Sequence, residues 1–137
     1  MITEDYVSFE IAKLLKEKGF DEICRAVYVI RDERLVHCTR HNIFDFTNNE
    51  RIKEVGDGDT AILAPTLQMT MKWLREIHHC VICITPLTFY CGENVNSWGY
   101  NIWAGDNLEV DEENTPKFTT YEEACEAAIK YCLESLI

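Results

Sequence analysis

The stretch from residue 64 to residue 85, APTLQMTMKWLREIHHCVICIT, constrains the fold more than any other part of the chain. Pro65 and Thr66 suit the start of a helix. The residues that recur at helical spacing form one apolar stripe: Leu67, Met71, Leu74 and His78, broadened by Thr70, Trp73 and Ile77. The β-branched, apolar run from Val81 to Ile84 favours a buried strand. A helix that leads almost directly into a strand predicts a domain in which helices pack on a sheet.

Two further helices are indicated by their ends. Ser8 is an N-cap candidate for a helix over residues 9–18, which Gly19 would end in the left-handed conformation. Thr120 and Glu123 form a capping box at the start of the last helix. That helix carries a broad apolar stripe, made of Ala124, Cys125, Ala128, Ile129, Cys132, Leu133 and Leu136. Both helices are therefore expected to bury one side against a sheet.

The strands are predicted to form two hairpins. Residues 24–30 and 35–38 make the first hairpin around a polar turn. The second hairpin joins the strand at 81–84, continued over 87–91, to a strand at 98–103. Because proline has no N–H, a strand that continues past Pro86 belongs at a sheet edge or a bulge. Residues 104–117 are predicted to form an acidic loop.

Residues 39–60 are predicted to be an irregular linker or insertion. Thr47 and Glu50 match a capping box, which predicts a short helix over residues 51–55 that ends at Gly56. The run 56–59, GDGD, predicts a turn, since it lacks the further oxygen ligands and the closing Glu of a calcium loop.

The expected order of elements is therefore αββ-αββ-α. We expect residues 1–137 to form a single α+β domain, with an antiparallel sheet of about four strands and the helices packed on it.

The chain is strongly acidic, with 24 Asp and Glu against 13 Lys and Arg and a net charge of −11. Such a surface repels a nucleic-acid backbone and an anionic membrane, so we expect neither as a direct partner. The acidic Met1–Asp5 segment lacks the apolar core of a secretory signal, which predicts a soluble, cytoplasmic protein. The simplest interpretation of this charge is that it keeps the protein soluble. The alternative is that the acidic surface binds a basic partner or imitates DNA.

Seven cysteines are present, at positions 24, 38, 80, 83, 91, 125 and 132. The odd number and the absence of a secretory signal argue against a disulfide framework. Reduced, mostly buried thiols are expected.

Two groups of residues have spacings that resemble metal sites. One contains His78, His79, Cys80 and Cys83, and the other contains His37, Cys38 and His41. A structural zinc needs four ligands on a tight turn, whereas Val81-Ile82 between the two thiols favours a strand that points them to opposite faces. We expect no metal and no cofactor, and His78, His79, Cys80 and Cys83 are the candidate ligands if a metal is bound.

Enzyme motifs are missing from the sequence. It contains no phosphate-binding glycine loop, no nucleophile elbow and no His-Glu-x-x-His. A Cys nucleophile with His37, His41 or His78 stays open, because such partners need only meet in space. No catalytic residue and no cofactor-binding residue is therefore assigned.

Three segments carry a resemblance to a known family: SFEIAKLLKEKGFDE, APTLQMTMKWLREIH and TYEEACEAAIKYCLESLI. They resemble small uncharacterised proteins carried by phages and mobile elements of gut Bacteroidetes. That family is distantly similar to phage proteins with layered α/β-sandwich domains. The resemblance implies a similar fold and genomic setting, and it carries over no catalytic residue. Residues 39–60 are longer than the family pattern implies.

The favoured function is a non-enzymatic accessory module that binds a protein partner. The alternatives are an acidic inhibitor or DNA mimic and, second, a metal- or thiol-dependent protein that acts through residues 78–83. A homodimer is a further possibility, because Trp98, Tyr100 and Trp103 together could exceed what one small core covers, although packing in the core or the hairpin is the preferred explanation for them.

Overall fold

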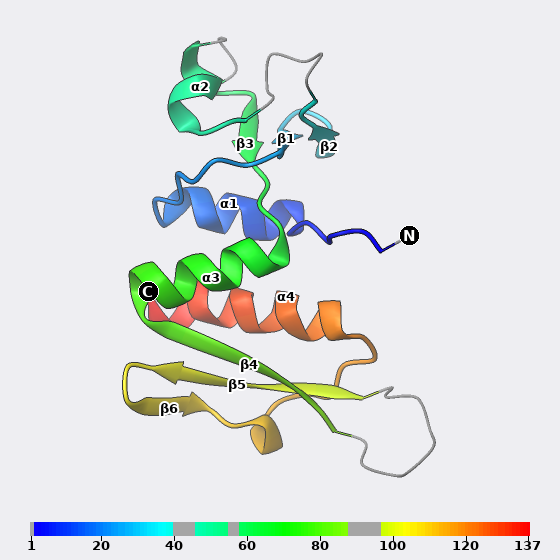
Figure 1. The fold of residues 1–137 in the computed structure, drawn as a ribbon, viewed down its shortest axis with the longest axis vertical. Helices are drawn as coiled ribbons and strands as arrows, with labels where there is room; N and C mark the ends of the chain where they lie inside the picture. The colour runs from blue at the N-terminus through cyan, green and yellow to red at the C-terminus, as the bar shows by residue number, and fades with distance from the viewer. Residues whose placement is uncertain (1, 40–45, 55–57, 88–96) are drawn as a thin grey trace. The chain divides into compact units, whose positions relative to one another are not determined.

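The computed structural model describes residues 2–39, 46–54, 58–87 and 97–137 (Figure 1). The chain divides into two compact units, Met1–Thr66 and Leu67–Ile137. Each unit is an α+β arrangement with its own antiparallel sheet. The single domain predicted for residues 1–137 stays a prediction. His41, Cys91, the turn at 56–57 and the predicted strand residues 88–91 lie outside the described residues.

The first unit begins with helix α1, Phe9–Glu17, in agreement with the predicted range. The Ile11 N–H donates to Ser8 Oγ at 3.3 Å, which caps the helix start. At the other end, Gly19 has a φ of 85°, and the Phe20 N–H donates to the Leu15 carbonyl at 3.0 Å. This bond satisfies one of the carbonyls that a helix end leaves unpaired, and it holds Phe20 in the core.

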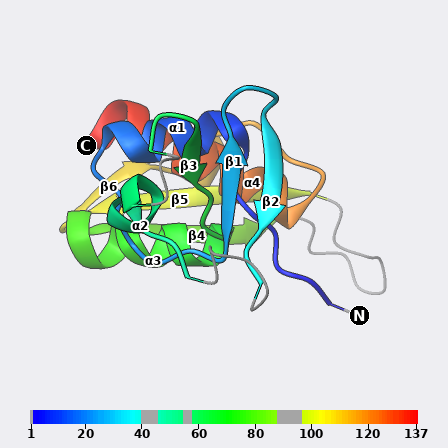
Figure 2. The ribbon, with the colours of Figure 1, turned by 90° about the horizontal axis from the view of Figure 1, so that it is seen from above.

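The sheet of the first unit contains β1 (Ala26–Val29), β2 (Arg34–His37) and β3 (Ala61–Leu63). The order is β2-β1-β3, with both pairs antiparallel (Figure 2). The hairpin of β1 and β2 was predicted, whereas β3 was not. β3 is only three residues long, too short to show strand periodicity, and its pairing with β1 defines it.

Helix α2, Asn49–Glu54, corresponds to the short helix predicted over residues 51–55 and begins two residues earlier. The predicted cap was wrong by one residue: the Arg51 N–H donates to Asn48 Oδ1 at 3.0 Å, not to Thr47. Thr47 is instead fully buried, and its N–H and carbonyl pair with Cys24 at 3.0 and 2.8 Å. Thr47 therefore pairs with Cys24, which is distant in the chain, and does not cap the helix as the local pattern predicted.

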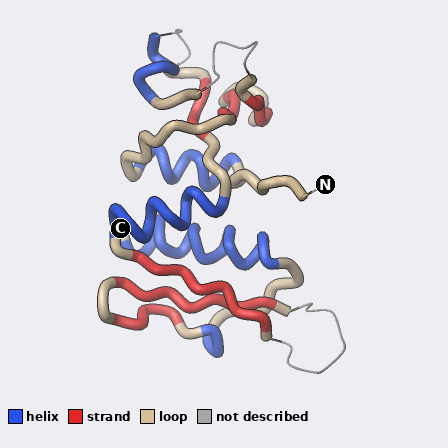
Figure 3. The backbone as a smooth tube through the Cα atoms, viewed as in Figure 1, coloured by secondary structure: helices blue, strands red, loops and turns tan. Residues whose placement is uncertain are grey.

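The second unit contains α3 (Leu67–His78), β4 (Cys80–Pro86), β5 (Trp98–Ala104), β6 (Asn107–Val110), a 3-10 turn η1 (Glu112–Asn114) and α4 (Tyr121–Tyr131). A π-helical turn, η2 (Cys132–Leu136), continues α4. The sheet order is β4-β5-β6, antiparallel throughout. Figures 1 and 3 show α3 and α4 on the same side of this sheet.

The predicted stripes of α3 and α4 are largely confirmed. In α3, Leu67, Thr70, Met71, Trp73 and Leu74 are buried, while Ile77 at the last turn is 57% exposed. In α4, the Glu123 N–H donates to Thr120 Oγ1 at 3.1 Å, as the capping box predicts. The return contact differs, because Glu123 Oε2 accepts from the Thr119 hydroxyl and N–H instead of the Thr120 N–H.

The predicted single sheet of about four strands is corrected: the described residues form two sheets of three strands each. The element order also differs from αββ-αββ-α, because α2, β3 and β6 are additional. β6 lies in the segment predicted to be an acidic loop. Gly105, at a φ of 61°, makes the turn that folds β6 back onto β5. Acidic residues concealed this strand in the sequence, since Asp and Glu are depleted in strands.

Candidate functional site

The corner between α3 and β4 holds His78 and His79, two of the four candidate metal ligands. The ring of His78 packs against Trp73 with centroids 4.6 Å apart, and within the described part of the chain its buried Nε2 has no hydrogen-bond partner. His79 is exposed and adopts a left-handed φ of 58°. Its backbone carbonyl accepts a hydrogen bond from the Gly105 N–H at 3.0 Å. His78 therefore serves packing, and His79 serves the turn into the strand.

The other two candidate ligands, Cys80 and Cys83, lie on opposite faces of β4, as strand alternation predicts. Cys80 is 2% exposed and its thiol lies 3.7 Å from the His78 carbonyl, whereas Cys83 is exposed. Over residues 2–39, 46–54, 58–87 and 97–137, no group of three or more His, Cys, Asp or Glu could hold a metal ion. The four candidates are thus not brought together.

The second group, His37 and Cys38, is also separated. His37 lies edge-on to Tyr6 with centroids 5.1 Å apart, while the buried Cys38 thiol lies 3.6 Å from Thr47 Oγ1. His41 lies outside the described residues.

Burial raises the pKa of Cys24 and of Cys132 to about 12, so both thiols stay protonated and poorly nucleophilic at neutral pH. These positions offer packing in place of thiol chemistry.

The side of the second sheet opposite α3 and α4 carries a group of exposed apolar side chains on adjacent strands. Strand register places Val81 beside Trp103, and Trp103 beside Leu108. These side chains are 36%, 40% and 44% exposed, and Cys83 is exposed on the same face. We call Val81, Cys83, Trp103 and Leu108 the open sheet face. Contiguous exposed apolar side chains of this kind mark interaction surfaces.

The three aromatic residues of β5 point to different faces of the sheet, because side chains alternate along a strand. Trp98 packs edge-on to Tyr121 of α4, with centroids 5.4 Å apart, and Tyr100 is 6% exposed and stacks on Phe118. Both belong to the core. Trp103, an odd number of residues away, points to the opposite side and forms the centre of the open sheet face. Sequence reasoning identified Trp103 and missed Val81 and Leu108, although strand alternation could have selected Val81.

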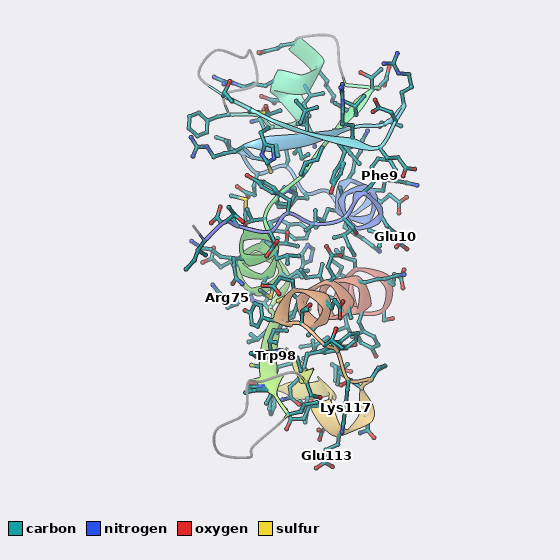
Figure 4. The ribbon with its side chains drawn as sticks, turned by 90° about the vertical axis from the view of Figure 1, so that its right-hand side faces the viewer. Phe9, Glu10, Arg75, Trp98, Glu113 and Lys117 are labelled. Carbon is teal, nitrogen blue, oxygen red and sulfur yellow. The ribbon has the colours of Figure 1, made fainter. Side chains whose placement is uncertain are left out.

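Acidic residues border the open sheet face. Asn101 of β5 lies opposite Cys83, on the same face of the sheet. Its side chain donates to Glu112 Oε2 at 3.1 Å and accepts the Glu112 N–H at 2.8 Å, which holds η1 against the open sheet face at Asn101. Asp111 caps η1 by accepting the Glu113 N–H at 3.1 Å. Glu113 lies at the end of the unit away from α3 and α4 (Figure 4).

Net charge is unequally divided between the units. Residues 67–137 contain four Lys and Arg against eleven Asp and Glu, a net charge of −7. Residues 1–66 contain nine against thirteen, a net charge of −4. The open sheet face therefore belongs to the more acidic unit, and its own strands β4 and β5 contain no charged residue.

Comparison of the chain with protein-family models, curated proteins and solved structures found no match. Among the described residues, no helix is both long and apolar enough to cross a membrane.

Proposed function

We propose that this chain is a non-enzymatic protein-binding module of a phage or mobile element, acting in the cytoplasm, and that it contacts its partner through the open sheet face. The single observation that supports the proposal is the exposed row of Val81, Trp103 and Leu108 on three adjacent strands. Tryptophan is enriched among residues that dominate binding energy, particularly at the centre of an interface. The genomic setting rests on the resemblance of the three helical segments.

The charge around the face favours a partner segment that combines apolar and basic side chains. Glu109, Asp111, Glu112 and Glu113 lie within β6 and the turn that follows it, whereas β4 and β5 are uncharged. A basic partner would be steered toward this border, and its apolar side chains would cover Trp103. The association rate should therefore fall as ionic strength rises.

The test is a comparison of Trp103→Ala with Ile77→Ala. Random peptides are selected on the immobilised full chain, and the enriched peptides are measured by calorimetry. We expect selected sequences rich in Lys, Arg and apolar residues, and about 30-fold weaker binding to Trp103→Ala, since truncating a central aromatic anchor costs roughly 2 kcal/mol or more.

Ile77→Ala is the matched control, because Ile77 is also an exposed apolar residue, at 57%, but lies on α3. Its binding should equal that of the unmodified chain. Peptides that bind Trp103→Ala and the unmodified chain equally well would place recognition elsewhere and overturn the proposal.

A second candidate is an acidic inhibitor that imitates DNA. The observation that favours it is the concentration of four carboxylates within residues 109–113, in a unit of net charge −7. Affinity capture from the host distinguishes the two functions. A DNA mimic would retain a DNA-binding protein that duplex DNA displaces, whereas partner binding through Trp103 would be lost in Trp103→Ala and insensitive to added duplex.

A metal- or thiol-dependent function has less support, because Cys80 and Cys83 face opposite sides of β4. Metal analysis of the purified chain tests it directly. Stoichiometric zinc that is lost in Cys83→Ser would favour the metal function over the binding module.

A further inference from the structure

The β4 strand forms one edge of the second sheet. Within the described part of the chain, β4 pairs only with β5. The Leu87 N–H donates to the Ser97 carbonyl at 2.8 Å, and the His79 carbonyl accepts the Gly105 N–H at 3.0 Å. Backbone groups alternate sides along an antiparallel strand. The odd-numbered residues of β4 therefore face β5, and the even-numbered Ile82 and Ile84 direct their backbone groups to the edge.

Within the described residues, the β4 strand itself carries few of the devices by which sheets avoid pairing with other chains. Exposed edges are usually protected by charged side chains, bulges or proline. The seven residues of β4, CVICITP, contain no charge, and their pairing with β5 is continuous without a bulge. Pro86 is the single protecting residue, and it stands at the very end of the strand.

The opposite edge of the same sheet is different. β6 is only four residues long and contains Glu109, and its pairing with β5 is interrupted by a register shift beside Trp103. It then leads into the acidic η1. A copy of this chain approaching β6 would place carboxylates against carboxylates. At β4 two copies would meet without like charges in the paired strands, which matters in a chain of net charge −11.

We propose that the β4 edge is a self-association site, at which two copies pair antiparallel and join their sheets into one. The strand length and the positions of its free backbone groups centre the two-fold axis on Cys83. In that register Ile82 exchanges hydrogen bonds with the partner's Ile84, and Cys83 stands opposite the partner's Cys83. The result is a symmetric, isologous contact that leaves Trp103 and Leu108 on the open sheet face uncovered.

The central pair gives the proposal a specific chemical test. Cys83 would form a non-hydrogen-bonded pair, in which Cα atoms are about 4.5 Å apart, within the range that a disulfide bridges. Mild oxidation with copper-phenanthroline should yield a covalent dimer on non-reducing gels. Cys91→Ser should still crosslink, and Cys83→Ser should not.

Light scattering over a concentration series measures the association without oxidation. The unmodified chain and Cys83→Ser should show the same concentration-dependent dimer, since serine preserves the pairing. Cys83→Asp would place two carboxylates directly opposite each other, and we expect the dimer dissociation constant to rise roughly fivefold or more. Cys83 is exposed, so the aspartate is accommodated in the monomer.

Leu108→Lys is the matched control, because Leu108 is an exposed residue of the same face but lies on the opposite edge strand. It should dimerise as the unmodified chain does. A monomer at about 1 mM protein, at which even a weak contact is populated, would overturn the proposal. Equal dimer formation by Cys83→Asp, or crosslinking that persists in Cys83→Ser, would also overturn it. Peptide binding through Trp103 is measured separately, so failure of one proposal leaves the other intact.

Discussion

The first unit sets the nine-residue α1 against strands of three and four residues, whereas the second sets α3 and α4 against two strands of seven. No residue of β1 or β3 is exposed, and α2 adds the buried Ile52 beside them. In the second unit both long helices lie on one side, and Val81 and Cys83 of β4 and Trp103 of β5 stay exposed on the other. Helices and strands thus leave β1 and β3 without an exposed residue in the first unit, whereas they leave one face of the sheet open in the second unit.

The difference shows that strand length and the placement of the covering helices decide whether one face of a sheet stays exposed. A short strand can be enclosed by the loops and helices around it. A seven-residue strand presents side chains to both faces, and a chain of limited length covers only one of them.

The largest expected effects concern the two cores. Ile62 of β3 and Ile102 of β5 are 2% and 0% exposed, and each anchors the sheet of its unit. Ile62→Ala and Ile102→Ala should each lower the free energy of unfolding by about 2–5 kcal/mol, because the transfer energy is lost and a cavity is left. Urea unfolding gives the loss, and native-state hydrogen exchange locates it.

The amides whose hydrogen exchange accelerates show whether each unit depends on its own core. If each unit depends on its own core, Ile62→Ala should affect the amides of β1 most, and Ile102→Ala those of β4. Identical acceleration throughout the chain in both variants would show that the two cores act as one cooperative structure.

Alkaline pH should destabilise both units through one buried thiol in each. Burial raises the pKa of Cys24 and of Cys132 to about 12 from an ordinary value of 9.0. Because the folded pKa is raised, the stability contribution is complete below pH 9.0 and is lost as pH rises toward about 12. Each thiol contributes at most about 1.4 kcal/mol per pH unit in this window.

The measurement is chemical unfolding at pH values from neutral to strongly alkaline, with Cys24→Ala and Cys132→Ala as the test variants. Each substitution should make the decline of stability with pH less steep. An unchanged slope in both variants would assign the alkaline transition to other groups, such as the lysines and tyrosines.

The smallest expected effects compare how two helices end. Gly19 after α1 and His79 after α3 both adopt a left-handed backbone, with φ values of 85° and 58°. This conformation costs a residue with a side chain roughly 1–2 kcal/mol, and glycine adopts it freely. Gly19→Ala should therefore destabilise the chain by about 1 kcal/mol, whereas His79→Gly should stabilise it by up to about 1 kcal/mol.

Thermal unfolding of the two variants measures the difference in sign. Gly19→Ala has open space around the added methyl group, so any loss reports the backbone conformation and not a steric clash. A destabilising His79→Gly would instead indicate that the exposed imidazole has a role of its own at the corner.

The local parts of this fold could be predicted from sequence, because their causes lie within a few residues. The boundaries of α1 follow from Ser8 and Gly19, and the start of α4 follows from Thr120. The opposite orientation of Cys80 and Cys83 follows from strand alternation alone. Thr47 was mistaken for a cap because a distant partner, Cys24, takes its backbone groups.

The candidate site was predicted less completely. Residues 78–83 attracted attention for their metal-like spacing, yet folding divides them between the core, the turn and the open sheet face. Val81 and Leu108 gained significance only when register placed them on either side of Trp103. They are 22 and five residues from Trp103 in the chain, and no local pattern relates all three.

By itself, the sequence determined the α+β class, the capped helices and the faces they bury, since hydrophobic periodicity and capping act over short distances. Only the tertiary structure decided that short strands β3 and β6 complete two sheets in place of one, and that one face of the second sheet stays open. The physical reason is that strand pairing satisfies backbone groups between segments far apart in the chain, so a three- or four-residue strand exists only where a partner strand offers its edge.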